Sequence, residues 1–255
     1  MPIPMPTLFR HWLQRLAARL PTALPSSCAL CGAGGDEPIC TGCQTQFFGV
    51  RTIRCTQCAI PFPATGTAIA PVCGECLKHR PAFDATIVAA DYLPPIDQLV
   101  LALKFGNRLA LAPLFAHMLR DAWLHAHSQD IALPALLCAV PLGAPRLAER
   151  GFNQALEIAK PLSHALGIRL DPHLAVRSRH TRAQSLLPPD QRRKNIRGAF
   201  TVRQRSIEFL RGQHIGVVDD VITTGETLNE LAATLKRFGA ARVTNLVFAR
   251  TPPKH

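Results

Sequence analysis

The decisive stretch of the chain, residues 214–235, reads HIGVVDDVITTGETLNELAATL. Its apolar first part predicts a β-strand over 214–219, and the pattern that follows predicts a helix over 226–238. Two carboxylates, Asp219 and Asp220, therefore stand at the carboxyl end of a strand. This is the edge of an open α/β sheet at which ligands bind.

The turn between this strand and this helix contains Thr223, Thr224 and Gly225. Backbone amides of such a turn, threonine hydroxyls and the positive end of a helix dipole together can hold a phosphate, and glycine allows its close approach. The neighbouring carboxylates can accept hydrogen bonds from vicinal sugar hydroxyls and orient a hydrated magnesium ion. A structural alternative exists, because residues 223–226 also fit a helix capping box. A capping box alone needs neither the doubled aspartate nor the doubled threonine.

Outward from this stretch, apolar runs alternate with helical patterns along the chain. Strands and helices are predicted, in turn, over 85–92, 136–140 and 242–249, and over 96–105, 110–125 and 153–166. Strands that alternate with helices at this spacing indicate an α/β domain with a mainly parallel sheet and flanking helices. Cys138 lies in the apolar run LLCAV and is expected to be buried in the core.

Eight of the nine cysteines form four CxxC pairs between residues 28 and 76. The two residues inside each pair allow one tight turn to present both sulfurs to one ion, and two such turns complete a tetrahedral site. We therefore predict two structural zinc ions, most simply held by Cys28, Cys31, Cys40 and Cys43, and by Cys55, Cys58, Cys73 and Cys76. An interleaved pairing would use the same ligands. A redox CxxC pair, an iron–sulfur cluster and incidental buried thiols are the competing interpretations.

The composition bounds the classes of protein that need to be considered. The 255 residues are 47% hydrophobic and carry 29 Lys and Arg against 17 Asp and Glu, a formal net charge of +12. This excludes a disordered tail and a disulfide-stapled miniprotein, and it favours polyanionic partners such as nucleic acid or phosphorylated small molecules. The 22 prolines argue against a coiled coil, and 12 Phe, two Trp and one Tyr offer few platforms for stacked bases.

The start of the chain, MPIPMPTLFRHWLQRLAARL, interrupts its apolar side chains with charged ones and does not resemble an export signal. Residues 7–20 have the period of a short basic amphipathic helix, so residues 1–27 are expected to form that helix and a linker. No run of 18 apolar residues occurs in the sequence, and we expect no membrane span. Clustered thiols without an export signal lead us to expect a cytoplasmic protein.

Two basic segments accompany the acidic pair. The stretch AVPLGAPRLAERGFNQ follows a predicted strand and places Arg146 and Arg150 where a second loop could meet a diphosphate. Residues 177–200 contain seven Lys and Arg and one histidine, with a single acidic residue and two consecutive prolines. Such a long, cationic segment is typical of a mobile loop that closes over a site. A solvated basic face is the competing interpretation.

Together, these motifs resemble the ComF family, whose members include ComFC and GntX-like proteins. The resemblance rests on the four CxxC pairs, ALKFGN, RGFNQ, the RxRxTxxQxxL and RxxNxRGAF patterns, and VVDDVITTGET. The last motif looks like the phosphoribosyl diphosphate (PRPP) signature of type I phosphoribosyltransferases. The match runs from Cys28 to Arg250. It implies a double zinc ribbon over 28–80, followed by a type I phosphoribosyltransferase-like domain over 81–255.

The resemblance also implies a role for each site residue. Asp219 and Asp220 would contact the ribose 2′ and 3′ hydroxyls. The 5′-phosphate would be wrapped by Thr223, Thr224, Gly225, Glu226 and Thr227. The diphosphate would be neutralised by magnesium and by Arg146, Arg150, Arg177 and Arg179. Because positive charge grows on the sugar in the transition state, positioning and electrostatics by these residues, chiefly Asp219, Asp220, Arg177 and Arg179, would supply the rate. Gly143 departs from the family, which often has histidine or serine there.

The function implied by the resemblance is a bacterial role in natural transformation or in the use of imported DNA. The expected reaction is pentosyl transfer from PRPP to an acceptor that the residues do not identify, with single-stranded DNA and competence proteins as macromolecular partners. A second hypothesis is a nonenzymatic adaptor that retains the PRPP site for sensing or structure. Such an adaptor would contact the backbone of single-stranded DNA through basic surfaces.

Overall fold

The computed structural model describes residues 26–49, 52–62, 72–126, 132–178, 196 and 198–253. The chain divides into two compact units, Met1–Val50 and Arg51–His255. The first unit holds the first two CxxC pairs, and the second unit holds the other two pairs together with the α/β fold. The helix predicted over 7–20 lies outside the described residues, and the domain boundaries stay predictions.

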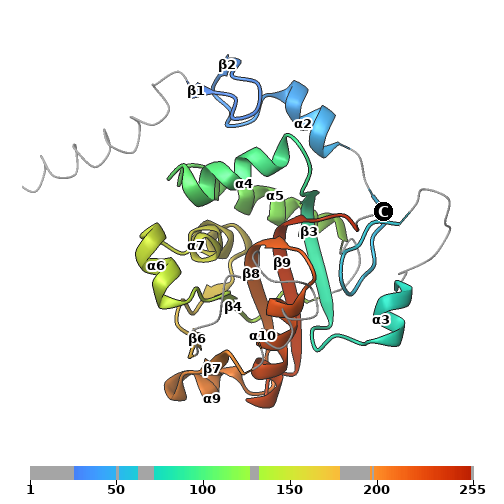
Figure 1. Ribbon diagram of the computed structural model, residues 1–255, viewed down its shortest axis with the longest axis vertical. Coiled ribbons are helices and arrows are strands. Elements are labelled where there is room, and N and C mark those ends of the chain that lie inside the picture. The colour runs from blue at the N-terminus through green and yellow to red at the C-terminus, as the bar shows by residue number, and fades with distance from the viewer. Residues whose placement is uncertain are drawn as a thin grey trace, which may run out of the picture. The chain divides into compact units, whose positions relative to one another are not determined.

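A five-stranded sheet with strand order β3-β9-β8-β4-β5 forms the centre of the second unit (Figure 1). Its strands are β3 (Ala85–Asp91), β4 (Leu136–Ala139), β5 (Arg169–Leu170), β8 (His214–Ile222) and β9 (Arg242–Arg250). Every neighbouring pair is parallel. The predicted α/β class with a parallel sheet is confirmed, and the long buried runs of β8 and β9 are typical of a sheet covered on both faces.

In the described part of this unit, four longer helices accompany the sheet: α4 (Ile96–Phe105), α5 (Leu111–Ala126), α7 (Gln154–Leu166) and α10 (Glu226–Arg237). Helices α5 and α7 pack against each other and against the sheet, and α10 packs against β9. The rings of Phe115 in α5 and Phe248 in β9 are fully buried and stack with centroids 3.5 Å apart. No helix in the described ranges is long and apolar enough to cross a membrane.

Helix α7 shows how local sequence sets a boundary of the fold. It begins after Asn153, whose side-chain oxygen accepts a hydrogen bond from the Ala155 amide at 3.1 Å. The carboxamide nitrogen of Asn153 donates to the carbonyl of Val140 at 3.0 Å, which ties the helix start to the end of β4. The helix ends at Gly167, which has a φ of +66°. Asparagine at the start and glycine at the end are favoured at these positions.

The core position predicted for Cys138 is confirmed. This residue lies in β4 and is 1% exposed. Burial raises the pKa of its thiol to about 12, so the thiol stays protonated at physiological pH. Cys138 is therefore a packing residue rather than a nucleophile or a metal ligand.

Several short elements were not predicted from the sequence. They are α6 (Ala144–Arg150), β6 (Ala175–Arg177), β7 (Phe200–Val202) and α9 (Ile207–Leu210). Strands β6 and β7 form an antiparallel pair in which Arg177 faces Phe200. The two ends of the segment 177–200, expected to be loop, are therefore paired strands, because their partners come together only in the folded chain. Residues 179–195 and 197 lie outside the described residues.

Within residues 26–49, the described part of the first unit, the chain forms a small antiparallel pair and one helix. Strand β1 (Ser26–Ser27) pairs with β2 (Gly34–Gly35), and α2 (Thr41–Phe48) follows. In the second unit, α3 (Gly74–Lys78) corresponds to α2 of the first. Each of these helices begins directly after the third cysteine of its set.

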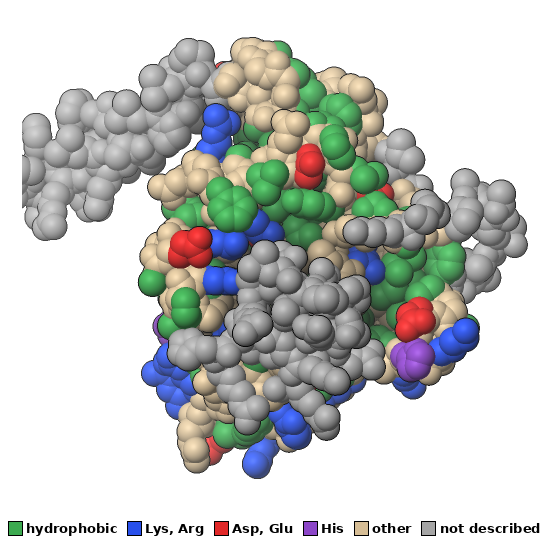
Figure 2. Space-filling view, in the orientation of Figure 1, with side chains coloured by type: hydrophobic (Ala, Val, Ile, Leu, Met, Phe, Trp, Pro, Cys, Tyr) green, Lys and Arg blue, Asp and Glu red, His purple; other side chains and the backbone are tan. Residues whose placement is uncertain are grey.

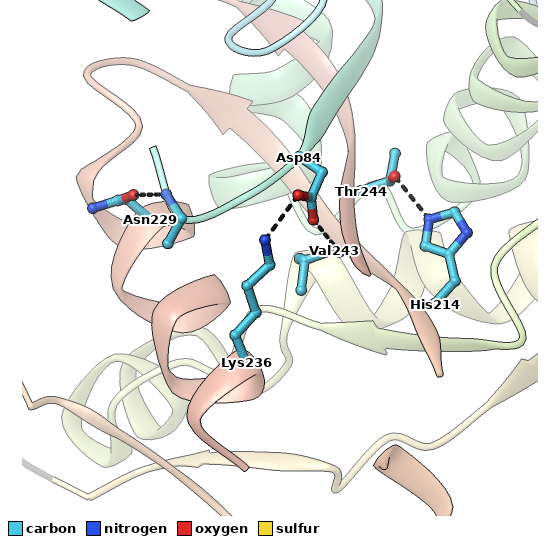
Figure 3. Close-up of polar contacts among 7 residues, drawn as sticks. Asp84, His214, Asn229, Lys236, Val243 and Thr244 are labelled. Atoms are coloured by element: carbon cyan, nitrogen blue, oxygen red, sulfur yellow. Dashed lines mark hydrogen bonds and ion pairs between the residues drawn. The ribbon is translucent and has the colours of Figure 1, made fainter. Parts of the chain in front are cut away.

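A short connection leads from the last CxxC pair into β3 and is fastened to β9 and α10 (Figure 3). The Asp84 carboxylate accepts a hydrogen bond from the Val243 amide and forms an ion pair with Lys236, both at 2.8 Å. The Asn229 side-chain oxygen accepts a hydrogen bond from the Ala82 amide at 2.7 Å. Three polar contacts therefore hold this connection on the α/β fold.

Candidate phosphate and zinc sites

The acidic pair lies near the carboxyl end of β8, where β8 is paired with β9 but no longer with β4. The pairing of β4 with β8 ends at Val218, whereas β9 pairs with β8 as far as Ile222. This longer pairing extends β8 beyond its predicted end. Asp219 and Asp220 therefore lie within β8 rather than after it. They follow Val218, the last residue of β8 that pairs with β4.

The two carboxylates have different partners. Asp220 is 7% exposed, and its Oδ2 atom forms an ion pair with Nζ of Lys104 in α4 at 3.0 Å. The Asp219 side chain accepts a hydrogen bond from the Asp220 amide at 2.9 Å. Burial and the charge of Asp220 raise the pKa of Asp219 to about 8, while Lys104 and Arg177 act in the opposite direction. Asp219 can therefore gain or lose a proton near neutral pH.

Two half-buried arginines, Arg146 of α6 and Arg177 of β6, lie within electrostatic reach of each other. Burial lowers the pKa of Arg177, Arg146 lowers it further, and Asp219 acts in the opposite direction. Burial and the charge of Arg150 likewise lower the pKa of Arg146. Guanidinium groups that repel one another beside a partly protonated carboxyl group form a positive region, which an anionic ligand would stabilise.

Aromatic rings lie beneath two of these arginines. The Arg150 guanidinium lies 4.9 Å from the ring centroid of Phe105, and that of Arg177 lies 5.6 Å from the centroid of Phe200. Gly143 is close to Arg177, since a Cβ atom at that glycine would lie 3.7 Å from the arginine Cδ. This is an ordinary van der Waals distance, so a methyl group would fit there without a clash. Because glycine has no such group, that space beside Arg177 stays open.

The turn from β8 into α10 is a helix N-terminus without a side-chain cap. The helix starts after Gly225, which has a φ of +82°, a conformation that glycine adopts without strain. The capping box considered for residues 223–226 requires a helix start after Thr223 and is not formed. Thr223 and Thr224 are exposed. Exposed hydroxyls thus stand at the positive end of a helix of 12 residues, where a phosphate would be stabilised.

The cysteines gather in the simpler of the two predicted pairings. Within each set the ligand atoms all lie within 4.8 Å of one another, and the sets are Cys28, Cys31, Cys40, Cys43 and Cys55, Cys58, Cys73, Cys76. The sulfurs of Cys31 and Cys40 are 3.7 Å apart, and those of Cys58 and Cys73 are 3.6 Å apart. A tetrahedral zinc ion needs its sulfur ligands about 3.8 Å apart. The geometry supports two structural zinc ions and excludes the interleaved pairing.

The backbone around the two sites repeats the same hydrogen bonds. The Cys40 amide donates to the Cys28 sulfur at 3.4 Å, and the Cys73 amide donates to the Cys55 sulfur at 3.3 Å. In both sites the residue after the second cysteine has a positive φ, +74° at Gly32 and +58° at Ala59. Amide donors to the sulfurs orient them and stabilise their charge, as is typical of structural zinc sites.

Family models match the chain in two places. A double zinc ribbon domain model matches residues 20–77, and a phosphoribosyl transferase domain model matches residues 153–254. "Competence protein F" of Haemophilus influenzae is 32% identical over 209 residues, which are 80% of this chain and 87% of that protein. The chain belongs to the ComF family. Its predicted order of a double zinc ribbon followed by a phosphoribosyltransferase fold is thereby confirmed.

Other relatives of this ComF-family protein carry names connected with DNA. The "DNA utilization protein YhgH" of Escherichia coli O6:H1 is 35% identical over 232 residues, 89% of this chain and 98% of that protein. "Competence protein ComFC" of Bacillus subtilis is 24% identical over 226 residues, 85% of each chain. Among solved structures, purine phosphoribosyltransferase from Pyrococcus horikoshii shares 17% identity at a TM-score of 0.29, over 65% of this chain and 77% of that chain.

The structure brings most of the predicted ligand-binding residues of this ComF-family protein into one region. Arg177 interacts electrostatically with both Asp219 and Arg146, and Arg179 lies outside the described residues. Lys104 was missed as a site residue, although ALKFGN was among the family motifs. Its signal was a lone lysine in the last turn of an apolar helix, which the sequence alone could not connect with Asp220.

Proposed function

We propose that this ComF-family protein binds PRPP, or a related ribose phosphate, at the end of β8. The proposal rests on one observation. The acidic pair lies between the start of α10, which has no side-chain cap, and two half-buried arginines, one of which interacts electrostatically with Asp219. Asp219 and Asp220 suit the ribose hydroxyls, the turn at Gly225 suits the 5′-phosphate, and Arg146 and Arg177 suit the diphosphate.

We infer that the reaction is transfer of the phosphoribosyl group to an acceptor. The bond from the sugar to the diphosphate breaks, a bond to the acceptor forms, and positive charge develops on the sugar between these events. Asp219 and Asp220 would stabilise this charge in their deprotonated form, and Arg146 and Arg177 would stabilise the departing diphosphate. Covalent help from the protein is not required, so the named residues act by position and charge.

The residues present fit a magnesium ion that arrives with the ligand. Within the described ranges, the groups of three or more metal-ligating side chains are the two cysteine sets, so the acidic pair offers carboxylates without further protein ligands. Magnesium keeps several waters and often binds through one or two carboxylates together with substrate phosphates. Bound in this way, it would neutralise charge on the diphosphate.

The cellular role proposed here follows the names of the relatives, which are a competence protein and a DNA utilization protein. We place the phosphoribosyl transfer in the uptake or use of DNA, in the cytoplasm. Nucleobases, nucleotides and DNA ends are the acceptor classes to screen, with diphosphate release from PRPP as the signal.

Calorimetric titration with PRPP and magnesium tests the proposed site. Replacing both carboxylates, Asp219→Ala with Asp220→Ala, should weaken binding more than about tenfold, because hydrogen bonds to charged groups are lost. The matched control is Asp97→Ala with Asp121→Ala, which removes two acidic side chains from α4 and α5 and should leave the affinity unchanged. Equal affinity in all three proteins would contradict the site.

A DNA-binding adaptor is the second candidate, and the charge of the protein favours it. The net charge is +12, and Lys and Arg are more frequent than acidic side chains on the face shown in Figure 2. Contacts to a phosphate backbone release counterions, so affinity for single-stranded DNA should fall steeply as salt rises. Absence of binding at low salt, or affinity that does not depend on salt, would remove this candidate.

A further inference from the structure

The second cysteine set, Cys55, Cys58, Cys73 and Cys76, is tied directly to the edge of the sheet. The Thr86 amide of β3 donates to the carbonyl of Thr56, in the turn of this set, at 3.1 Å. The Arg54 guanidinium donates to the carbonyl of Ala59 at 3.3 Å and forms an ion pair with Asp91, the last residue of β3, at 2.8 Å. The turn that presents the sulfurs is therefore held on β3.

Arg250, the last residue of β9, connects this cysteine set with the turn from β8 into α10. We call residues 223–227 of that turn the phosphate loop. Arg250 is 5% exposed, and its Nη1 atom donates to the carbonyl of Ile222 at 3.1 Å and to the carbonyl of Thr223. Arg250 lies opposite Asp91 of β3 in the sheet. Burial lowers the pKa of its guanidinium, and the sulfurs of Cys58, Cys73 and Cys76 act in the opposite direction. One buried cation thus contacts the loop entrance and lies within electrostatic reach of the cysteine set.

The contacts of Arg250 help to determine where the first amides of the phosphate loop point, together with the Thr251 amide, which donates to the Ile222 carbonyl at 3.0 Å. A peptide unit is planar and trans, so its carbonyl and its N–H group point in opposite directions. Because the carbonyls of Ile222 and Thr223 point toward Arg250, the amides of Thr223 and Thr224 point away from it. These amides are donors that a phosphate in the loop would meet.

The charge of the zinc site strengthens this arrangement. A zinc ion with four thiolate ligands carries two net negative charges, and donors around the sulfurs stabilise that charge. Without the ion the thiolates are no longer held around one centre, and the buried guanidinium loses a fixed anionic neighbour. Its contacts with the loop carbonyls would then be less well defined.

We propose that Arg250 is a positioning residue through which the zinc site of the second cysteine set holds the phosphate loop in its binding geometry. Loss of this zinc ion therefore loosens the loop. The further consequence, weaker binding of a ribose phosphate, rests on the proposed function of the loop.

Two variants of the full chain break the connection at different points. Cys58→Ser removes a zinc ligand, so the zinc content should fall from two ions to one. Arg250→Gln removes the guanidinium and should leave both ions in place. In both variants, hydrogen exchange at residues 223–227 should become faster, and calorimetric affinity for ribose 5-phosphate should fall about tenfold. Arg250→Lys keeps the charge without the planar fork and should restore part of the affinity.

Two matched variants control for general damage. Arg242→Gln removes an arginine from the first position of the same strand, and Cys40→Ser removes a ligand of the other zinc site. Both should keep the wild-type exchange rates in the loop. The double variant Cys58→Ser with Arg250→Gln should bind ribose 5-phosphate no more weakly than the worse single variant, because both changes break one connection.

Wild-type exchange rates in the loop of Arg250→Gln would overturn the inference, and so would additive losses of affinity in the double variant. If Cys58→Ser does not fold, the comparison of Arg250→Gln, Arg250→Lys and Arg242→Gln still decides it. Failure of the wild type to bind ribose 5-phosphate would remove the proposed function instead. The exchange rates in the loop would still test the link to the zinc site.

Discussion

At the scale of single residues, Asp219 combines a half-buried position with a neighbouring carboxylate. Burial and Asp220 raise its pKa from 3.8 in the unfolded chain to about 8 in the fold. Between these values the folded state holds a proton that the unfolded state has released. The stabilising effect of that proton is fully present below about pH 4 and is lost as the pH rises toward 8.

The variant Asp219→Asn should therefore be more stable than the wild type at pH 8, by about 2 kcal/mol, and should show a smaller gain at pH 5. The amide stays neutral at both values, so only the wild type loses stability across this window. Urea unfolding at the two pH values measures the difference. Asp121→Asn serves as the control and should show no gain at pH 8, because that carboxylate lies on the surface, far from the acidic pair in sequence and paired with Arg120. An equal gain for Asp219→Asn at both pH values would contradict the argument.

Lys104 is the second residue whose role depends on one contact. Lys104→Met leaves the buried carboxylate of Asp220 without its cation and should lower the free energy of unfolding by about 2 kcal/mol. The control is Lys160→Met, since the pair of Lys160 with Glu157 lies on the surface and contributes little. Denaturant unfolding compares the two variants. The interpretation fails if Lys104→Met costs no more than Lys160→Met.

At the scale of elements, the start of α10 depends on the backbone of Gly225. Its φ of +82° is strained for any residue with a side chain, so Gly225→Ala should lower the free energy of unfolding by about 1 kcal/mol. It should also weaken ribose 5-phosphate binding, because the loop amides change direction. Gly74→Ala in α3 is the control, since that position has ordinary φ and nothing within 4 Å of the new methyl group. Thermal unfolding and titration decide, and equal effects at both glycines would refute the claim.

The elements themselves were largely predictable, and the exceptions share a cause. The predicted range 96–105 coincides with α4, and the strand predicted over 242–249 matches β9. Apolar periodicity and capping residues are local signals, so they can be recognised in the sequence without knowledge of the fold. Short elements such as β6 and β7 lack such a signal, because each is stabilised by pairing with a distant segment.

At the scale of the whole molecule, the two units differ in what stabilises them. Within residues 26–49 the buried apolar side chains are those of Cys28, Ile39 and Cys43, two of which are zinc ligands. The second unit has a large core around its sheet. The metal must therefore supply most of the folding free energy of the small unit.

Stripping zinc with a chelator should make the amides of residues 26–49 exchange rapidly while those of β8 and β9 remain protected. The sheet keeps its own core without the metal, whereas the small unit does not. Hydrogen exchange with and without chelator measures both regions in one experiment. Re-addition of zinc should restore protection in 26–49. Continued protection of that segment after complete removal of zinc would show that it folds without the ion.

The sequence by itself determined the α/β class, the main helices and strands, and the eight zinc ligands. These follow from periodicity and from the short spacing of CxxC pairs, which are properties of neighbouring residues. Only the tertiary structure decided the pairing of the cysteine sets, the ion pair of Lys104 with Asp220, and the position of Arg250 against the loop and within electrostatic reach of the second cysteine set. The contacts of Lys104 and Arg250 join segments far apart in the chain, and they exist only because the packing of helices around β8 and β9 brings those segments together.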